Sequence, residues 1–284
     1  MVSTLTGFNL LIQGVLFFCR TTEDEIDICH SASPGEAAVD RSSLPRAEDA
    51  TFFLVRFNSN GTIDKTFGNN GFVRTSFGTG FAVARHLAVT PGGKIVVCGF
   101  KASNISAPTH FALARYLSTG KLDSTFSGDG KVITPLATDG DSCNSLILRS
   151  KGRVLAGGYV FEGSNQSMGF AAYRSNGSPD TSFSGDGKQI LDFGGADNVS
   201  ALALQQDGRI LVAGAAGTKK FALVRLKSDG TVNSTFGTSG VASAPLNGHG
   251  GYAYDLVVQS TGRIVVVGNG HDGSQDFAAA RFLP

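Results

Sequence analysis

From residue 52 onward the sequence repeats itself with a period of about 56 residues, and this repetition limits the folds open to the chain. One motif reads Phe-Ala-Leu-Ala-Arg-Tyr at residues 111–116, and its relatives begin at Phe52, Met168, Phe221 and Phe277. The motif alternates between its two faces, which is typical of a strand with one buried face. A turn glycine and a Thr/Ser-Phe pair follow each of the first four copies. The pairs end at Phe67, Phe126, Phe183 and Phe236, with spacings of 59, 57 and 53 residues.

A second repeated motif predicts an antiparallel hairpin in each period. It consists of an apolar strand, a glycine turn, a basic residue and a second apolar strand that ends in glycine. A connection this short joins neighbouring antiparallel strands. The four copies span residues 87–99, 146–158, 202–214 and 256–268.

Each period therefore holds four predicted strands: the hairpin pair, the Phe-Ala-Leu-Ala-Arg-Tyr strand and a shorter strand such as residues 131–134. Because an isolated hairpin is only marginally stable, such units have to pack face to face. We predict an all-β fold, a β-propeller of four-stranded antiparallel blades. Five blades are the preferred count, with N-terminal residues completing a partial blade. A four-bladed ring with merged ends is one alternative, and a fragment of a larger ring that completes itself by association is another.

The repeated side chains have structural interpretations. Phe67 and its equivalents are assigned to the core, where burial of each would contribute roughly 2 kcal/mol. The arginine of the first motif is expected to pair with a carboxylate such as the repeated aspartate at Asp64, Asp123 and Asp180. The third copy has Ala172 in place of that arginine, so the pair cannot be required in every blade.

Together these motifs resemble the bacterial delta-60 repeat. The resemblance rests on Phe-Ala-Leu-Ala-Arg-Tyr, on Gly-x-Leu-Asp-x-x-Phe and on the hairpin Asp-Gly-Arg-Ile-Leu-Val-Ala-Gly, and it covers about residues 52–284. It implies a β-propeller and a secreted or surface location, and it defines no activity.

The first fifty residues differ in character from the rest. Residues 5–18 are mostly apolar and too short to span a bilayer as a helix, and residues 20–50 are polar and acidic. The apolar run resembles part of an export signal, although it has no Lys/Arg-rich start. We therefore expect an N-terminal apolar segment plus acidic linker at 1–50, a single propeller domain at 51–284, no transmembrane span, and an extracellular or cell-surface location.

The net charge and the cysteine pattern limit which partners and metal ions the chain is expected to bind. The formal net charge is +1, with no basic stripe, so a nucleic-acid partner is not expected. No C-x-x-C pair is present, which argues against a zinc site. Cys98 and Cys143 fall in predicted strands and are interpreted as two small buried side chains. Cys19 and Cys29 are the pair considered for a disulfide in an exported protein.

Function is expected where the loops differ between copies, at the end of the channel where the inner strands begin. The aligned leucines at the inner strands are Leu87, Leu146, Leu202 and Leu256. The residues just before them are His86, Ser145, Ala201 and Asp255, and those two before are Arg85, Asn144, Ser200 and Tyr254. Most are polar and they vary, unlike the leucines, so they are candidates for lining a wet channel or a site.

Three kinds of site follow from these residues. A hydrolytic triad would use Ser145 as nucleophile, His86 as base and Asp255 to orient it, although equivalent slots in different blades are expected to lie too far apart. Ligand binding would involve the second set of slots and nearby loop residues: Arg85, Asn144, Ser200, Tyr254, His249, Tyr252 and His110. No cofactor is expected, with calcium as the alternative, held by Asp139, Asp141, Asp197 and Asn198.

Two functions remain open from the sequence. The first is a secreted or surface binding module that takes a small molecule, peptide or glycan at the loop face, with self-association as a further option. The alternative is a hydrolase of small esters, lactones or phosphotriesters with its site at the channel mouth. The sequence does not decide whether the chain is an enzyme.

Overall fold

The computed structural model describes residues 51–244, 251–271 and 275–283, together with the backbone of three short strands before residue 50. The boundary predicted at residue 50, the apolar segment and linker, and the cysteines Cys19 and Cys29 lie outside the described residues. Among the described residues, no helix is long and apolar enough to cross a bilayer.

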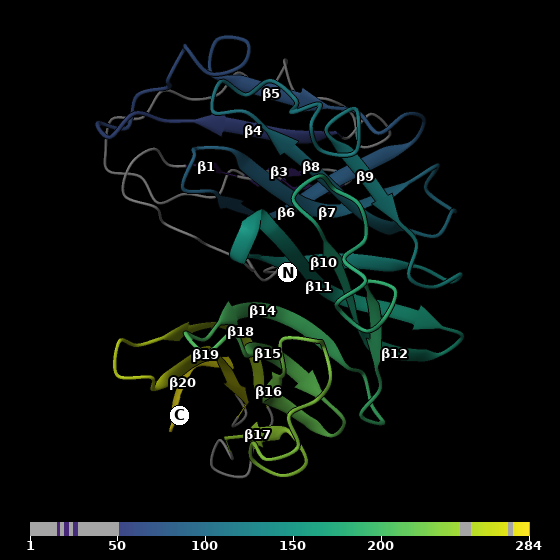
Figure 1. The fold of residues 1–284 in the computed structure, drawn as a ribbon, viewed down its shortest axis with the longest axis vertical. Coiled ribbons are helices and arrows are strands. Elements are labelled where there is room, and N and C mark those ends of the chain that lie inside the picture. The colour runs from purple at the N-terminus through teal and green to yellow at the C-terminus, as the bar shows by residue number, and fades with distance from the viewer. Residues whose placement is uncertain are drawn as a thin grey trace.

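The described chain folds into five antiparallel sheets that follow one another around an axis, as the blades of a propeller do (Figure 1). Blade 1 contains β1 (Leu16–Phe17), β4 (Phe52–Arg56) and β5 (Phe72–Thr75). Blade 2 contains β6 (Phe81–Val89), β7 (Ile95–Ala102), β8 (His110–Tyr116) and β9 (Lys131–Thr134). Blade 3 contains β10 (Asp141–Arg149), β11 (Arg153–Glu162), β12 (Asn165–Tyr173) and β13 (Lys188–Leu191).

The last two blades follow the same order. Blade 4 contains β14 (Asn198–Leu204), β15 (Ile210–Ala216), β16 (Lys219–Leu226) and β17 (Val241–Ser243). Blade 5 contains β18 (Gly251–Val258), β19 (Ile264–His271) and β20 (Gln275–Phe282). A separate two-stranded ribbon joins β2 (Arg20–Thr22) and β3 (Glu25–Asp27). The predicted all-β propeller is confirmed, with three four-stranded blades and a three-stranded blade at each end.

The core lies between blades rather than within them. Phe111 and Leu113 of blade 2, for example, pack in one buried cluster with Leu146 and Val154 of blade 3. The same arrangement joins each neighbouring pair of blades. The repeated phenylalanines are buried in these clusters, as predicted, at Phe67, Phe126, Phe183 and Phe236.

A repeated arginine fastens the joints between blades 1 and 2 and between blades 2 and 3 at the end of the propeller that carries the hairpin turns, called here the turn face. Arg115 Nε donates to Asp123 Oδ2 at 2.8 Å within blade 2, and its Nη1 donates to the Ser175 carbonyl of blade 3. Its guanidinium also lies 4.7 Å from the ring centroid of Phe126. Burial raises the pKa of Asp123, but hydrogen bonds from Lys94 and Thr125 and the charge of Arg115 outweigh it and hold that pKa well below its usual value.

Blade 3 reaches the same result with a different residue. Its third strand carries Ala172, and Arg149 from the end of the inner strand takes over the joint. Arg149 Nη2 donates to the Ser228 carbonyl of blade 4 at 2.5 Å, and its guanidinium lies 5.8 Å from the Phe183 ring centroid. Blade 3 therefore keeps an arginine at its joint, but this arginine comes from the inner strand instead of the third strand.

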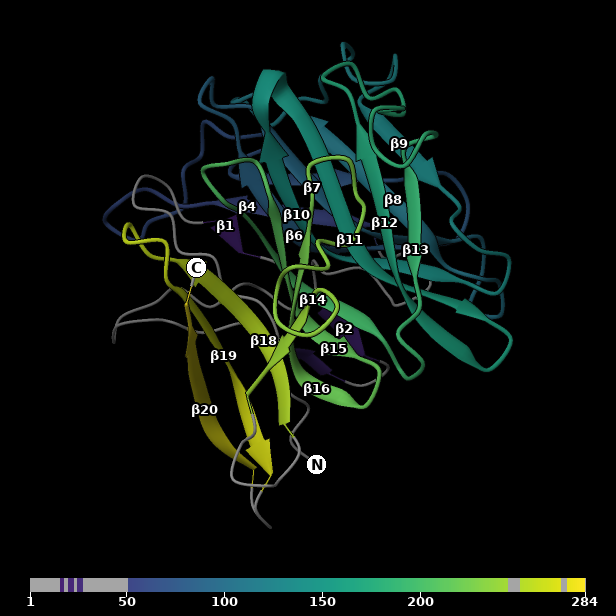
Figure 2. The same cartoon turned by 60° about the horizontal axis from the view of Figure 1, so that its bottom comes forward.

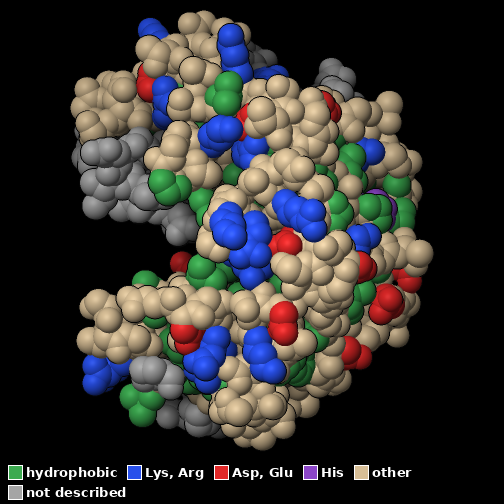
Figure 3. All heavy atoms as spheres, viewed as in Figure 1, with side chains coloured by type: hydrophobic (Ala, Val, Ile, Leu, Met, Phe, Trp, Pro, Cys, Tyr) green, Lys and Arg blue, Asp and Glu red, His purple; other side chains and the backbone are tan. Residues whose placement is uncertain are grey.

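The ring of blades is open at one point. β18 packs against β14, β15 and β16 of blade 4, but in the described part of the chain the strands of blade 5 make no comparable contact with those of blade 1. The space-filling view shows a notch between the half of the molecule that ends in blade 1 and the half that ends in blade 5 (Figure 3). Among the described residues, the five blades thus form an arc with a notch between blade 1 and blade 5.

Replacing Asp123 tests the importance of the joint. Asp123→Asn removes the charge that faces Arg115 and Lys94, and we expect it to lower the free energy of unfolding by roughly 2–3 kcal/mol. Urea denaturation followed by circular dichroism measures this change. The control is Asp129→Asn, at an exposed carboxylate 3.5 Å from Lys131 Nζ, where a loss below roughly 0.5 kcal/mol is expected. Equal losses in both variants would show that the buried pair has no special role.

Candidate functional site

The segments that enter the inner strands and those that link the second and third strands gather at the other end of the propeller, called here the loop face. The described segments of the loop face are 77–82, 100–110, 136–143, 160–167, 193–199 and 215–220. They are tied to one another by backbone contacts, such as the bond from Asp141 N to Thr109 O at 2.7 Å. The loop face is thus a connected surface, as expected for loops carried on a common scaffold.

Each of the four complete inner strands contains a β-bulge at the same place. The register against the second strand shifts between Ala84 and His86 in blade 2 and between Cys143 and Ser145 in blade 3. Blades 4 and 5 shift at the equivalent positions. The extra residue at the four bulges is Arg85, Asn144, Ser200 or Tyr254. A bulge redirects side chains, so the variable slots seen in the sequence lie at a special point of the fold.

The bulge also explains the glycine that ends every hairpin motif. A Cβ placed on Gly99 would lie 1.9 Å from the Val83 carbonyl oxygen, and one on Gly158 would lie 1.8 Å from that of Ser142. Only glycine allows this approach of the two strands. These terminal glycines were the signal in the sequence that could have located the bulges.

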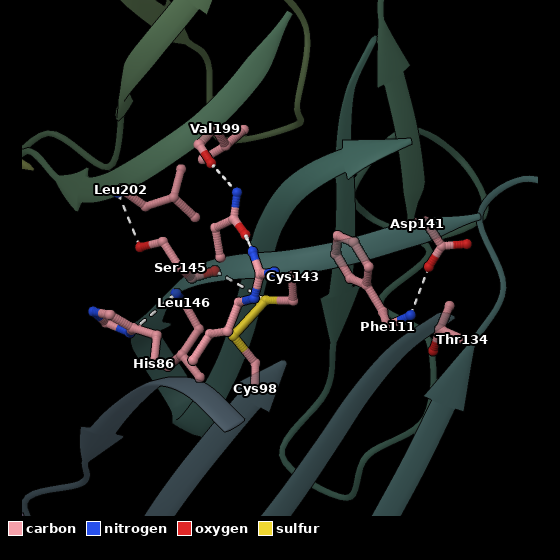
Figure 4. Close-up of a disulfide and its surroundings, with 12 residues drawn as sticks. His86, Cys98, Phe111, Thr134, Asp141, Cys143, Ser145, Leu146, Val199 and Leu202 are labelled. Carbon is pink, nitrogen blue, oxygen red and sulfur yellow. Dashed lines mark hydrogen bonds between the residues drawn. A yellow bond between two sulfur atoms is a disulfide. The ribbon is translucent and has the colours of Figure 1, made fainter. Parts of the chain in front are cut away.

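All three residues proposed as a triad accept from backbone N–H groups, two of them across a blade joint. His86 Nδ1 accepts from the N–H of Leu146 at 3.3 Å, and Ser145 Oγ accepts from the N–H of Leu202 at 3.1 Å (Figure 4). Asp255 Oδ1 accepts from Leu256 N–H in its own strand at 2.8 Å. Each of these three side chains therefore accepts a hydrogen bond from a backbone N–H beside a bulge. Their catalytic role stays a prediction.

The predicted binding residues form part of a second relay around the axis. Arg85 Nη1 donates to Asn144 Oδ1 at 2.5 Å, and Asn144 Nδ2 donates to the Val199 carbonyl at 2.9 Å, so three blades are linked in series. Arg85 also lies 5.0 Å from the ring centroid of Phe100. In blade 4 the corresponding bond stays within one strand, where Ser200 Oγ lies 3.4 Å from Asn198 Oδ1.

Blade 5 holds two further members of this predicted binding set, Tyr252 and Tyr254, while His110 begins β8 of blade 2. Tyr254 is half-buried, and burial raises the pKa of its phenol. Tyr252 is more exposed, and its N–H donates to Asn269 Oδ1 at 2.9 Å. His249 lies outside the described residues. The described members of the predicted binding set are thus spread over blades 2 to 5.

The carboxylates considered for calcium hold loops in place. Asp141 is fully buried and accepts from Phe111 N–H at 2.5 Å and Leu136 N–H at 2.9 Å, with His110 Nδ1 at 3.1 Å. Asp197, also fully buried, accepts from the N–H groups of Phe193 and Gly217 at 2.6 and 2.5 Å.

The other two members of that set do the same for neighbouring segments. Asp139 accepts from Gly163 N–H at 2.6 Å, and Asn198 accepts from Ala215 N–H at 3.2 Å. Within the described ranges, no group of three or more His, Cys, Asp or Glu side chains is arranged to hold a metal ion. Calcium binding remains a prediction without support from this geometry.

One feature of this region adds to the sequence interpretation. Cys98 on β7 and Cys143 on β10 are joined by a disulfide between blades 2 and 3, with Cα atoms 6.0 Å apart (Figure 4). Both side chains are fully buried, as expected, but the bond between them was not predicted. The residues lie 45 positions apart, and only the packing of one blade on the next brings them together.

Comparison with known proteins supports the fold. The family model described as "Domain of unknown function (DUF5122) beta-propeller" matches residues 48–67, 91–126, 151–183, 205–236 and 259–284, about half of the chain. These segments coincide with the repeated motifs. The finer resemblance to the delta-60 repeat is not tested by this match. No curated protein sequence matches the chain significantly.

Solved structures show likeness of fold only. NanB sialidase from Streptococcus pneumoniae is 9% identical with a TM-score of 0.51, covering 78% of this chain and 33% of that one. A protein of unknown function from Dyadobacter fermentans is 10% identical with a TM-score of 0.47, covering 87% and 70%. PorZ, a surface component of the type-IX secretion system of Porphyromonas gingivalis, is 13% identical with a TM-score of 0.42, covering 79% and 29%. The chain thus spans about a third of NanB.

The joint at His86 predicts a pH dependence of stability. Burial lowers the pKa of His86 from 6.5 to about 4, so the unfolded chain binds a proton more readily than the folded chain below pH 6.5. Stability due to the neutral imidazole is therefore full above pH 6.5 and is lost as the pH falls toward 4. Between pH 7.5 and pH 5 we expect the free energy of unfolding to fall by about 2 kcal/mol from this group.

Denaturant titrations at the two pH values, compared with His86→Asn, measure this contribution. The asparagine amide can still accept from Leu146 N–H but does not titrate. The fall from pH 7.5 to pH 5 should therefore be smaller in the variant by the stated amount. The same fall in both proteins would mean that His86 is not buried in its neutral form.

Proposed function

The chain belongs to the DUF5122 family of β-propeller domains of unknown function, and we propose that it is a secreted or cell-surface interaction module. In this proposal a peptide or glycan binds at the loop face, and the blades serve as a rigid support. The observation that carries the proposal is a difference between the polar side chains of the inner strands and loop bases and the side chains of the loop tips. Polar side chains at the inner strands and loop bases, such as Ser145, Asp141 and Asp197, accept hydrogen bonds from backbone N–H groups, whereas the loop tips carry exposed side chains.

The apolar groups of the loop tips support a binding role. Phe161 is 37% exposed, and its ring lies 5.2 Å from that of Tyr159 in an edge-to-face pair. Ile105, at the equivalent loop of blade 2, is 82% exposed. Aromatic side chains held on fixed strands provide contact area at a low entropic cost, and they are enriched where binding energy is concentrated.

Polar groups surround the aromatic pair of blade 3. Glu162 and Asn165 are exposed beside Phe161, and Asn165 Nδ2 donates to Asp192 Oδ2 at 3.1 Å. An apolar centre with a polar rim is the usual composition of an interaction site. Residues 160–167 have no close counterpart in the other copies, so this loop is the part of the face best suited to confer specificity.

The disulfide supports the proposed location outside the cytoplasm. Disulfides persist in oxidising compartments and are rare in cytosolic proteins. Cys98 and Cys143 are both fully buried in the joint between blades 2 and 3. The bond would stabilise this joint by restricting the unfolded chain.

Array binding tests the proposed ligand face. Purified protein is applied to glycan and peptide arrays, and any ligand found is titrated by calorimetry against Phe161→Ser. We expect the variant to bind at least roughly tenfold more weakly, since aromatic anchors commonly contribute more than 1 kcal/mol. The matched control is Val89→Ser, which is also 37% exposed but lies at the turn-face end of β6.

The same preparations should be screened against p-nitrophenyl esters, lactones and phosphotriesters, with and without chelator. We expect no turnover above that of the heat-denatured protein. Turnover that is lost in both His86→Ala and Ser145→Ala would contradict the binding-module proposal in favour of the hydrolase.

Peptide mapping tests the disulfide and the location that it supports. Protein exported to an oxidising compartment should yield a linked peptide pair containing Cys98 and Cys143 under non-reducing conditions. Reductant should lower the free energy of unfolding by roughly 2–4 kcal/mol. The control is the double variant Cys98→Ala, Cys143→Ala, whose stability reductant should not change. Free thiols at both positions in the exported protein would contradict the assignment.

A further inference from the structure

Blade 5 has an apolar side that no other blade covers. Phe277 on β20 is 82% exposed, and Val257 on β18 is 57% exposed. Ala279 is exposed beside them, and Val265 and Val267 on β19 are half-buried. We call this surface the outward face of blade 5. Figure 2 shows β20 at the outer edge of this sheet, on the side away from blade 4.

In every other blade the equivalent face is buried against the next copy of the repeat. The counterparts of Phe277 are Phe52, Phe111 and Phe221, which are 0%, 0% and 3% exposed. The counterparts of Val265 and Val267 in blade 2 are Val96 and Cys98, which are 1% and 0% exposed. The outward face of blade 5 therefore has the residues of a blade joint but lacks the neighbouring blade.

Arg281 carries the polar part of the same joint. Its counterparts Arg56 and Arg115 donate to the carbonyl groups of Ser118 and Ser175 in the following blade. Arg281 is exposed, and no such acceptor is found for it within the part of the chain that the structure describes. The donor half of a joint is thus present at this end of the arc.

The acceptor half lies at the other end of the arc, on blade 1. Ser59 occupies the position of Ser118, Ser175 and Ser228 in the repeat, and it is exposed. Two residues later, nothing lies within 4 Å of a Cβ placed on Gly61. At the equivalent Gly120, by contrast, Phe67 of the preceding blade lies 3.0 Å away. The turn of blade 1 therefore has no preceding blade.

The apolar group available on the outward side of blade 1 is the half-buried Phe53, because Val55 beside it is only 7% exposed. Phe53 and Val55 occupy the positions that Ala112 and Ala114 hold in blade 2, which pack in one cluster with Phe52 of blade 1. Phe53 is half-buried and stacks on Phe72 with ring centroids 5.8 Å apart. An aromatic pair at this position can contact an incoming phenylalanine.

We propose that the outward face of blade 5 binds blade 1 of a second copy of this chain, head to tail. Phe277 packs against Phe53 of that copy, and Arg281 donates to its Ser59 carbonyl. The occupant is a second copy because Arg281 and Ser59 repeat, at the two ends of one chain, the donor and acceptor that join blades 1 and 2 and blades 2 and 3. A head-to-tail contact of this kind produces a closed ring of copies or an open filament, depending on the rotation that relates one copy to the next.

Sedimentation of the full chain over about 1–100 μM tests this proposal. We expect the average mass to rise above the 29.4 kDa of one chain with increasing concentration. Phe277→Asp and Arg281→Glu at the head, and Phe53→Asp at the tail, should each raise the dissociation constant roughly 10- to 100-fold. The matched control is Ile105→Asp, since Ile105 is equally exposed at 82% but lies on the loop face.

Circular dichroism establishes that each variant is folded. If Phe53→Asp does not fold, Asn60→Lys replaces it, because it places a positive charge beside the acceptor turn without altering a packed residue. A protein that stays monomeric at every concentration would overturn the proposal. So would association that survives the folded tail variant, which would indicate contact between two copies of blade 5. Association that Ile105→Asp weakens as much as Phe277→Asp does would also overturn it.

Discussion

The packing of one blade against the next is the interaction on which the rest of the structure depends. A blade is a thin antiparallel sheet whose two faces are both apolar, so it has no interior of its own. Phe111, for example, becomes buried only because Leu146 of the next blade covers it. The arginine joints add direction to this packing, since Arg115 reaches the Ser175 carbonyl only when the blades are correctly aligned. Stability is therefore a property of pairs of blades, and the outward face of blade 5 leaves Phe277 and Val257 exposed.

The β-bulge links this packing to the residues that were considered for chemistry. A bulge leaves an N–H group without its usual strand partner, and the preceding blade supplies an acceptor, which is His86 for blade 3 and Ser145 for blade 4. Blade 4 has Ala201 in that slot, and in blade 5 Asp255 instead bonds the neighbouring N–H of its own strand. The identity of the slot residue varies because an imidazole, a hydroxyl or a carboxylate can each accept one hydrogen bond. Variation among polar residues is thus compatible with a structural requirement.

The repeat predicted the fold because the glycines, the phenylalanines and the alternation of strand residues act locally. The pairing of Arg115 with Asp123 followed from the same register. Two features were not predicted: the disulfide between Cys98 and Cys143, and the bond of Arg149 to blade 4 in the blade whose third strand carries Ala172. Both depend on which strands of neighbouring blades come into contact. The candidate residues lie on the inner strands, as expected, but their hydrogen bonds to backbone groups were not predicted. A polar residue on an inner strand has the same sequence signature whether it binds a ligand or a backbone N–H.

The structure also limits where recognition can vary. Replacing His86, Ser145, Asp141 or Asp197 would leave buried N–H groups without acceptors, which typically costs 1–3 kcal/mol for each group. The tips of the loops have no such obligation, because Asp141 and Asp197 hold the loops at their bases. Residues such as Phe161 and Ile105 can therefore change while the strands keep their positions. A new binding specificity at the loop face would consequently require no change in the joints that hold the blades together.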